Sequence, residues 1–212
     1  MKKSKAILMA LCAVLLVAAS VMGTLAYLTS TDTVTNTFTV GNVAITMDEL
    51  DVDNDNNTQD NVTVDNVTRD KANAYKLLPG HTFTKDPTIH VASTSEDCYL
   101  FVKVVNEIAA IEAKDTDTSK TSIAAQMEAK GWDVVDATNG IYVYADAEGK
   151  PAAVTAGSDV VVFDNFKISD GVNNATLATY NSKTIVVTAY AVQKDGFESK
   201  TASEIWTAAN FS

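Results

Sequence analysis

Three aspartates at alternate positions, Asp51, Asp53 and Asp55, are the side chains whose type and spacing best fit a chemical role. In an extended segment, alternate carboxylates can converge on a calcium ion, which binds several hard oxygen ligands. An EF-hand is excluded, because Asn56 stands where that loop needs glycine and Val62 where it needs glutamate. The spacing therefore leaves two interpretations, a calcium site and a solvated acidic loop.

Histidine and cysteine give weaker signals. His81 and His90 lie nine positions apart without the HExxH spacing of zinc proteases, so they are either structural or solvated residues or a metal-binding pair. Cys98 lies in an apolar strand pattern, which favours a small buried residue over a nucleophile that would need a histidine base nearby. Because GxSxG, Walker-type and GxGxxG motifs are also missing from the sequence, we expect no enzymatic activity and no cofactor other than calcium.

Residues 1–26 have the layout of an export signal. Three lysines within the first five positions precede an apolar stretch at 6–22, and small residues follow, among them Thr24 and Ala26. This order predicts a signal peptide cleaved between Ala26 and Tyr27. We therefore expect membrane contact only before cleavage, and a product that is secreted to the extracellular matrix or cell surface.

The charge and length of the expected product restrict its partners. The 212-residue chain has a formal net charge of −11, and loss of residues 1–26 with their three lysines would leave 186 residues with a net charge of −14. A polyanion of this kind repels nucleic acid and anionic membranes. Cys98 would be the one remaining cysteine, so a single domain at 27–212 must fold without an internal disulfide.

Residues 27–40 read YLTSTDTVTNTFTV, with threonine at nearly every odd position. Val34, Phe38 and Val40 share the even positions. Strict alternation of this kind, rich in β-branched residues, predicts a strand. It either pairs within its own sheet or adds to the sheet of a neighbouring subunit as a donor strand.

Strand patterns dominate the rest of the chain. Residues 97–108 and 183–193 are apolar on both faces, which predicts covered strands, and Asn139-Gly140 predicts a hairpin between 132–135 and 141–145. Further strand patterns cover residues 43–49, 88–91 and 159–168. Residues 51–70 interrupt the series with an excursion rich in Asn and Asp, in which Val62 and Val64 could form a short strand.

Helical signals are few. A helix is predicted over 119–130 and ends at Gly131, and a second short helix begins at Thr201, whose spacing to Glu204 fits a capping box. Many strands with one or two short helices predict an all-β fold, a jelly-roll-like β-sandwich.

Several blocks of sequence occur in an order that resembles the TasA/camelysin family. They are GTLAYLTSTDTVTNTFTVGNVAITMDE, LLPGHTFTKDPTIHV, CYLFVKVVNE, GW followed by GIYVY, and VTAYAVQKDGF. The resemblance spans essentially the whole chain. These are exported matrix proteins of Gram-positive bacteria, whose signal is cut by a SipW-type signal peptidase.

The resemblance implies a jelly-roll subunit of biofilm-matrix fibres that self-associates and contacts other matrix proteins. The donor strand would lie within 27–40, with Val34, Phe38 and Val40 as anchors, and one subunit's strand would complete the sheet of the next. Two alternatives remain: a monomeric, calcium-stabilised surface adhesin, and a camelysin-like metalloprotease. No recognisable zinc motif in the sequence supports the protease.

Overall fold

The computed structural model describes Ser4, Lys5 and residues 7–9, 11–16, 41–53, 62–64, 67–116 and 119–211. The chain divides into two units, Met1–Val40 and Gly41–Ser212. The described residues of the first unit up to position 16 are helical. Nowhere in the described ranges is a helix both long and apolar enough to cross a membrane.

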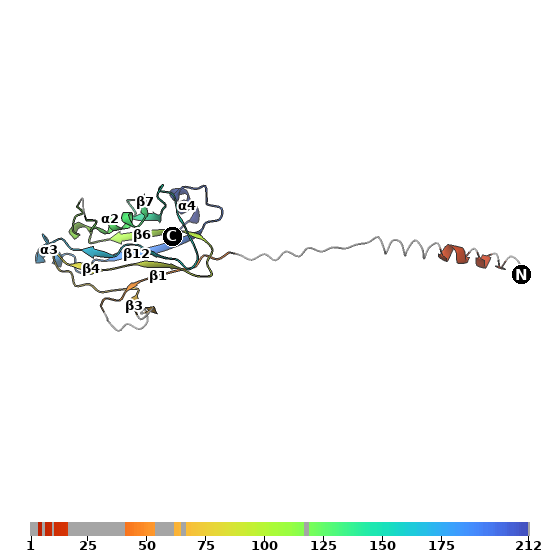
Figure 1. Ribbon diagram of the computed structural model, residues 1–212, viewed down its shortest axis with the longest axis horizontal. Helices are drawn as coiled ribbons and strands as arrows, with labels where there is room; N and C mark the ends of the chain where they lie inside the picture. Colours follow the sequence, from red (N-terminus) through yellow and green to blue (C-terminus); the bar gives the residue numbers. More distant parts are fainter. Residues whose placement is uncertain are drawn as a thin grey trace. The chain divides into compact units, whose positions relative to one another are not determined.

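Antiparallel strands make up most of the second unit (Figure 1). The first sheet has the order β10 (Asp159–Val161), β5 (Thr88–Val91), β1 (Ile45–Leu50), β3 (Val67–Asp70), β2 (Val62–Val64). The second has the order β12 (Ile185–Gln193), β6 (Cys98–Asn106), β8 (Ile141–Tyr144), β7 (Trp132–Asp136), and β9 (Ala153–Val154) also pairs with β6. Strand β7 and two helices, α2 (Ile123–Ala129) and α4 (Ala202–Ala209), lie on one side of β6 and β12, and β1 and β3 lie on the other. This is the all-β, sandwich-like arrangement that the strand patterns predict.

A two-stranded pair, β4 (Thr82–Thr84) with β11 (Asn165–Lys167), extends the β5–β10 pair of the first sheet. Two backbone hydrogen bonds bridge the interruption: Lys85 N donates to Asp164 O at 3.2 Å, and Val162 N donates to Pro87 O at 2.8 Å. Pro87 has no N–H to donate, so a regular ladder cannot continue through it.

Strand β6 lies at the centre of the packing, because its two faces are both covered. Leu100 and Val102 belong to the core between the sheets, whereas Tyr99 and Phe101 pack on the opposite face against Ile205 of α4 (Ala202–Ala209). Side chains alternate between the faces of a strand, so a run apolar at both parities is buried on both sides. The prediction of a covered strand at 97–108 is thus confirmed.

The helices follow local signals. In α2 (Ile123–Ala129), the Ser122 side chain accepts from Ala125 N at 3.2 Å, and Gly131 just beyond the end has a φ of +86°. Thr201 and Glu204 form the predicted capping box of α4. The short helices η1 (Ala109–Ile111) and α3 (Asn174–Ala178) were not predicted, because so few residues show no helical period.

Candidate functional site

A groove of about 1330 Å³ opens in the described part of the second unit. Residues of β1 border it on one side, and the start of β12 borders it on another. The segment 70–78 and helix α3 complete its walls. The groove therefore lies between β1 of the first sheet and the start of β12 in the second.

The lining of the groove is mostly apolar and also contains charged residues of both signs. Phe166 stacks on Phe83 with ring centroids 5.1 Å apart, and Tyr75 meets Phe166 edge to face at the same distance. Met47 and Leu177 add aliphatic surface. A lining of this kind suits an extended segment with apolar side chains better than a highly charged ligand.

Strand β12 leaves one edge open within the described residues, because its one strand partner there is β6. Backbone bonds at both ends of the ladder show which residues face β6: Glu107 N donates to Thr184 O at 3.0 Å, and Lys194 N donates to Asp97 O at 2.9 Å. Hydrogen-bonded pairs alternate along an antiparallel ladder. The odd residues of β12, such as Ile185 and Val187, therefore direct their backbone groups away from β6.

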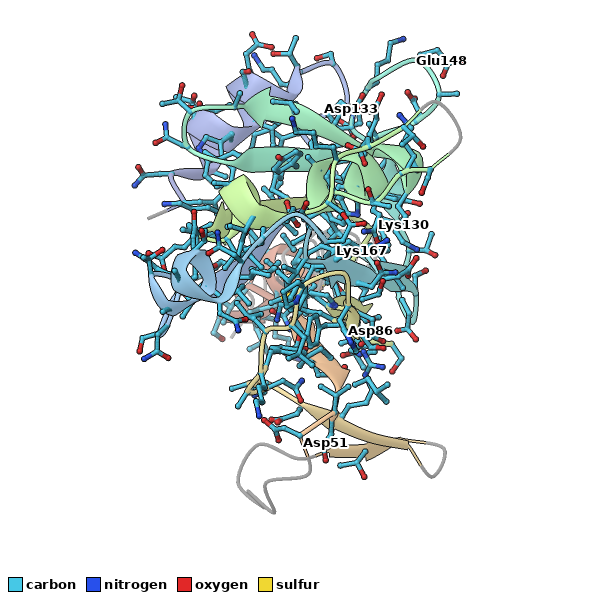
Figure 2. The ribbon with its side chains drawn as sticks, turned by 90° about the vertical axis from the view of Figure 1, so that its left-hand side faces the viewer. Asp51, Asp86, Lys130, Asp133, Glu148 and Lys167 are labelled. Carbon is cyan, nitrogen blue, oxygen red and sulfur yellow. The ribbon has the colours of Figure 1, made fainter. Side chains whose placement is uncertain are left out.

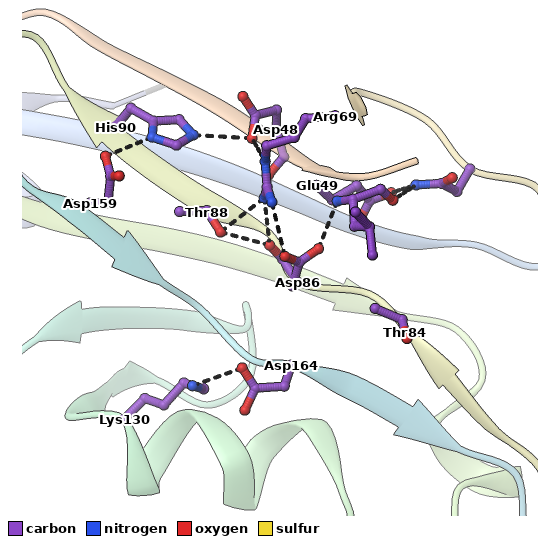
Figure 3. Close-up of polar contacts among 12 residues, drawn as sticks. Asp48, Glu49, Arg69, Thr84, Asp86, Thr88, His90, Lys130, Asp159 and Asp164 are labelled. Atoms are coloured by element: carbon purple, nitrogen blue, oxygen red, sulfur yellow. Dashed lines mark hydrogen bonds and ion pairs between the residues drawn. The ribbon is translucent and has the colours of Figure 1, made fainter. Parts of the chain in front are cut away.

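Within the first sheet, a charged cluster beside this groove joins β3 to β1 and to the segment before β5 (Figure 3). The Arg69 guanidinium binds Asp48, reaches Asp86 Oδ2 at 3.1 Å and donates to Thr88 Oγ1 at 3.1 Å. Its donors also reach the carbonyl oxygens of Asp48 and Asp86. With so many of its donors satisfied, Arg69 is a structural clamp across β1, β3 and the lead into β5.

His90 extends this cluster on β5. Its Nε2 lies 3.0 Å from Asp48 Oδ1 and its Nδ1 lies 2.7 Å from Asp159 Oδ1. Burial alone would lower the pKa of His90, but the hydrogen bonds to the two carboxylates outweigh it and the pKa is raised. Both ring nitrogens of His90 are thus engaged by carboxylates.

Two aspartates of the DxDxD pattern, Asp51 and Asp53, lie among the described residues beside a third carboxylate. In the described part of the chain, the one convergent group of potential metal ligands is Asp51, Asp53 and Asp70. Asp51 lies near one end of the second unit, far from Glu148 at the other end (Figure 2). The sequence pointed to Asp51 and Asp53 but missed Asp70. A signal was available, since Asp51 and Asp70 begin and end one excursion, whose ends an antiparallel return brings together.

Cys98 is fully buried at the start of β6. Burial, with a smaller contribution from Asp97, raises the pKa of the thiol to about 11. A thiol with that pKa is protonated at neutral pH and is a poor nucleophile. The interpretation of Cys98 as a small buried residue is confirmed.

The other residues singled out from the sequence lie outside the described residues. These are Thr24, Ala26 and Tyr27 at the expected cleavage site, Val34, Phe38 and Val40 of the expected donor strand, and Asp55. Their roles stay predictions.

Comparisons of the chain with models of protein families, with curated proteins and with solved structures gave no match. The groove and the open edge of β12 therefore carry the functional argument.

Proposed function

We propose that this chain is a secreted structural subunit that polymerises into extracellular biofilm-matrix fibres. Residues 27–40 of one copy would lie along the open edge of β12 in the next copy, with their apolar side chains in the groove. The two sheets would then form a jelly-roll-like sandwich that is completed only by the neighbour's strand.

The observation that carries this proposal is an open strand edge beside an apolar groove. A strand edge presents unpaired N–H and C=O groups, and proteins usually cover such edges or protect them with charge. Here the start of β12 is apolar instead, and the side chain of Val186 is 47% exposed. An unprotected apolar edge of this kind favours addition of another strand.

The sequence of residues 27–40 fits such an edge in length and in pattern. Fourteen residues at about 3.3 Å each span roughly 46 Å, more than the roughly 30 Å of the nine-residue β12. In an extended strand, Val34, Phe38 and Val40 would share one face, so they could enter an apolar groove together while the threonines face away. Burial of each anchor would contribute about 1.5–3 kcal/mol.

Export would control when the strand becomes available. Before cleavage by a SipW-type signal peptidase, the apolar segment 6–22 would hold the precursor at the membrane. Cleavage after Ala26 would release Tyr27 as the start of the donor strand. Because each subunit gives a strand to the next, the contact is head to tail and builds a filament.

Negative-stain electron microscopy tests the proposal on two purified chains, one beginning at Tyr27 and one at Gly41. We expect fibres from the first and monomers from the second, because only the first carries the donor strand. Fibres from the Gly41 chain would show that residues 27–40 are not the donor. Monomers from both chains across salt, pH and calcium would favour a monomeric surface-binding protein instead.

A further inference from the structure

We infer that Asp51, Asp53 and Asp70 bind a calcium ion at the junction of β1 and β3. One carboxylate oxygen from each residue lies within 4.8 Å of the other two. This site does not depend on the proposed fibre function.

Strand pairing brings the three residues together. In the β1–β3 ladder, Glu49 faces Asp70, and two positions further on Asp51 N donates to Thr68 O at 3.1 Å. Asp51 thus follows the end of β1 directly, and Asp70 is the last residue of β3. The carboxylates are therefore held by neighbouring strand ends and not by a long solvated loop.

Asp70 is the observation that points to a ligand. Its side chain is 0% exposed, and its Oδ1 accepts from Lys71 N at 2.5 Å and from Ala72 N at 3.2 Å. Its Oδ2 is buried and has no hydrogen-bond partner among the described residues. A buried carboxylate oxygen without a partner is costly, and a bound cation would remove that cost.

The register partner of Asp70 shows what a satisfied carboxylate looks like in the same place. Glu49 is also buried, but its Oε2 pairs with Lys85 Nζ at 2.6 Å and its Oε1 accepts from Asn73 Nδ2 at 3.0 Å. Glu49 thus has a cation and a second donor. Among the described residues, Glu49 has a positively charged partner and Oδ2 of Asp70 has none.

The loops around the site are already fixed by hydrogen bonds. Asn73 Oδ1 accepts from Val52 N at 2.8 Å, and Asn73 Nδ2 donates to Leu50 O at 2.9 Å. Ala74 N donates to an Asp53 carboxylate oxygen. These bonds hold the segments that follow β1 and β3 against each other, so a cation would meet a preformed site.

The donor set selects the class of cation. All three ligands are carboxylate oxygens, which suit hard cations and not zinc or copper. Calcium binds oxygen at about 2.3–2.6 Å, so two ligands on opposite sides of one ion are about 4.6–5.2 Å apart. Oxygens within 4.8 Å of one another fit that range. Water and backbone carbonyls would complete the coordination.

Thermal unfolding of the full-length chain after removal of divalent ions tests the site, with CaCl2 or MgCl2 added back. At about 10 mM calcium and a dissociation constant of about 0.1 mM, we expect Tm to rise by roughly 5–10 °C. Calorimetric titration should show one calcium ion per chain. Magnesium at the same concentration should raise Tm less.

The decisive variant is Asp70→Asn, which keeps the size and the Oδ1 acceptor but removes the charge. It should lose the calcium-dependent rise in Tm, whereas Asp195→Asn, with the same charge change at an exposed turn, should keep it. Asp51→Asn provides the same test if Asp70→Asn does not fold. The assignment is overturned if calcium leaves the wild-type Tm unchanged, if Asp70→Asn and Asp51→Asn respond like the wild type, or if magnesium acts equally.

Discussion

Strands β6 and β12 pair with each other over nine residues, yet only β6 is enclosed. Strand β6 has β12 on one edge and β8 with β9 on the other, and its residues from Cys98 to Val102 are all buried. Strand β12 has β6 on one edge within the described residues, and its residues are half-buried or exposed. Two strands that are both apolar on each face thus differ in the number of neighbouring strands with which they pair.

This difference shows that an apolar strand pattern predicts burial of the two faces of a strand. It does not predict whether the backbone groups along the strand's edges are paired. Both faces of β12 carry apolar side chains, since Val187 packs toward the core between the sheets and Tyr190 packs against Trp206 of α4. The backbone N–H and C=O groups along its free edge are a separate requirement. They are satisfied by hydrogen bonds to another strand and not by side-chain packing. The proposed function depends on that edge.

The largest effect is expected from a proline on the open edge of β12. Val187 directs its N–H away from β6, so Val187→Pro removes no bond of the β6–β12 ladder. It removes a donor that an added strand would need. In the chain beginning at Tyr27, we expect this substitution to abolish fibres in electron micrographs while circular dichroism still shows a folded β protein.

The matched control lies on the other outer strand of the same sheet. Ala145 N donates to Gly131 O at 2.8 Å, so by alternation the backbone groups of Val134 point away from β8. Its side chain is 59% exposed. Val134→Pro should leave the fibres intact. Loss of fibres in both variants, or in neither, would contradict a donor strand on β12.

Truncation of one apolar side chain in each strand should lower the free energy of unfolding much more in β6 than in β12. Phe101 of β6 is fully buried against Trp206 and Phe211, so Phe101→Ala should lower the free energy of unfolding by about 3–5 kcal/mol. Val186 of β12 is half exposed, and Val186→Ala should cost less than about 1 kcal/mol. Urea unfolding of the chain beginning at Gly41 measures both. Equal losses would mean that β12 is as enclosed as β6.

Most of the fold could be predicted from local patterns. The hairpin at Asn139-Gly140 is an example, because Gly140 has a φ of +67° and a Cβ there would lie 2.2 Å from Val104 O. The strand at 159–168 was predicted as one element but is two, β10 and β11. The segment that pairs with it, from β4 to β5, contains Pro87, which interrupts the ladder. The interruption can be predicted only once it is known which strands pair.

The site was less predictable, because it depends on which strands become neighbours. Asp51 and Asp53 stood out by their spacing, whereas Asp70 joins them only through the β1–β3 register. In the same way, the partners of Arg69 come from residues 17 to 21 positions away in the chain. No pattern of period two or 3.6 encodes such pairings.

The smallest effect is expected where β6 ends and β12 begins, at two glutamates in opposite environments. Burial raises the pKa of Glu112 to about 7, and its Oε1 is buried without a partner among the described residues. Glu107 is exposed, and hydrogen bonds from Thr184 together with Lys183 lower its pKa. Near the end of β6, the buried Glu112 thus resists charging, whereas the exposed Glu107, bonded to the residues before β12, favours it.

These shifts give opposite dependences of stability on pH. A raised carboxyl pKa means that the folded chain holds the proton more tightly, so the contribution of Glu112 is full below about pH 4.5 and is lost as pH rises through about 7. Glu112→Gln should therefore be more stable than the wild type at pH 8, by roughly 1–3 kcal/mol, and lose this advantage near pH 5.

The contribution of Glu107 is present above its unfolded pKa and is lost on acidification, so Glu107→Gln should be slightly destabilised at pH 7 and match the wild type at low pH. Urea unfolding between pH 3 and 8 measures both, and a Glu112→Gln variant with the wild-type pH profile would show that this carboxyl group is solvated.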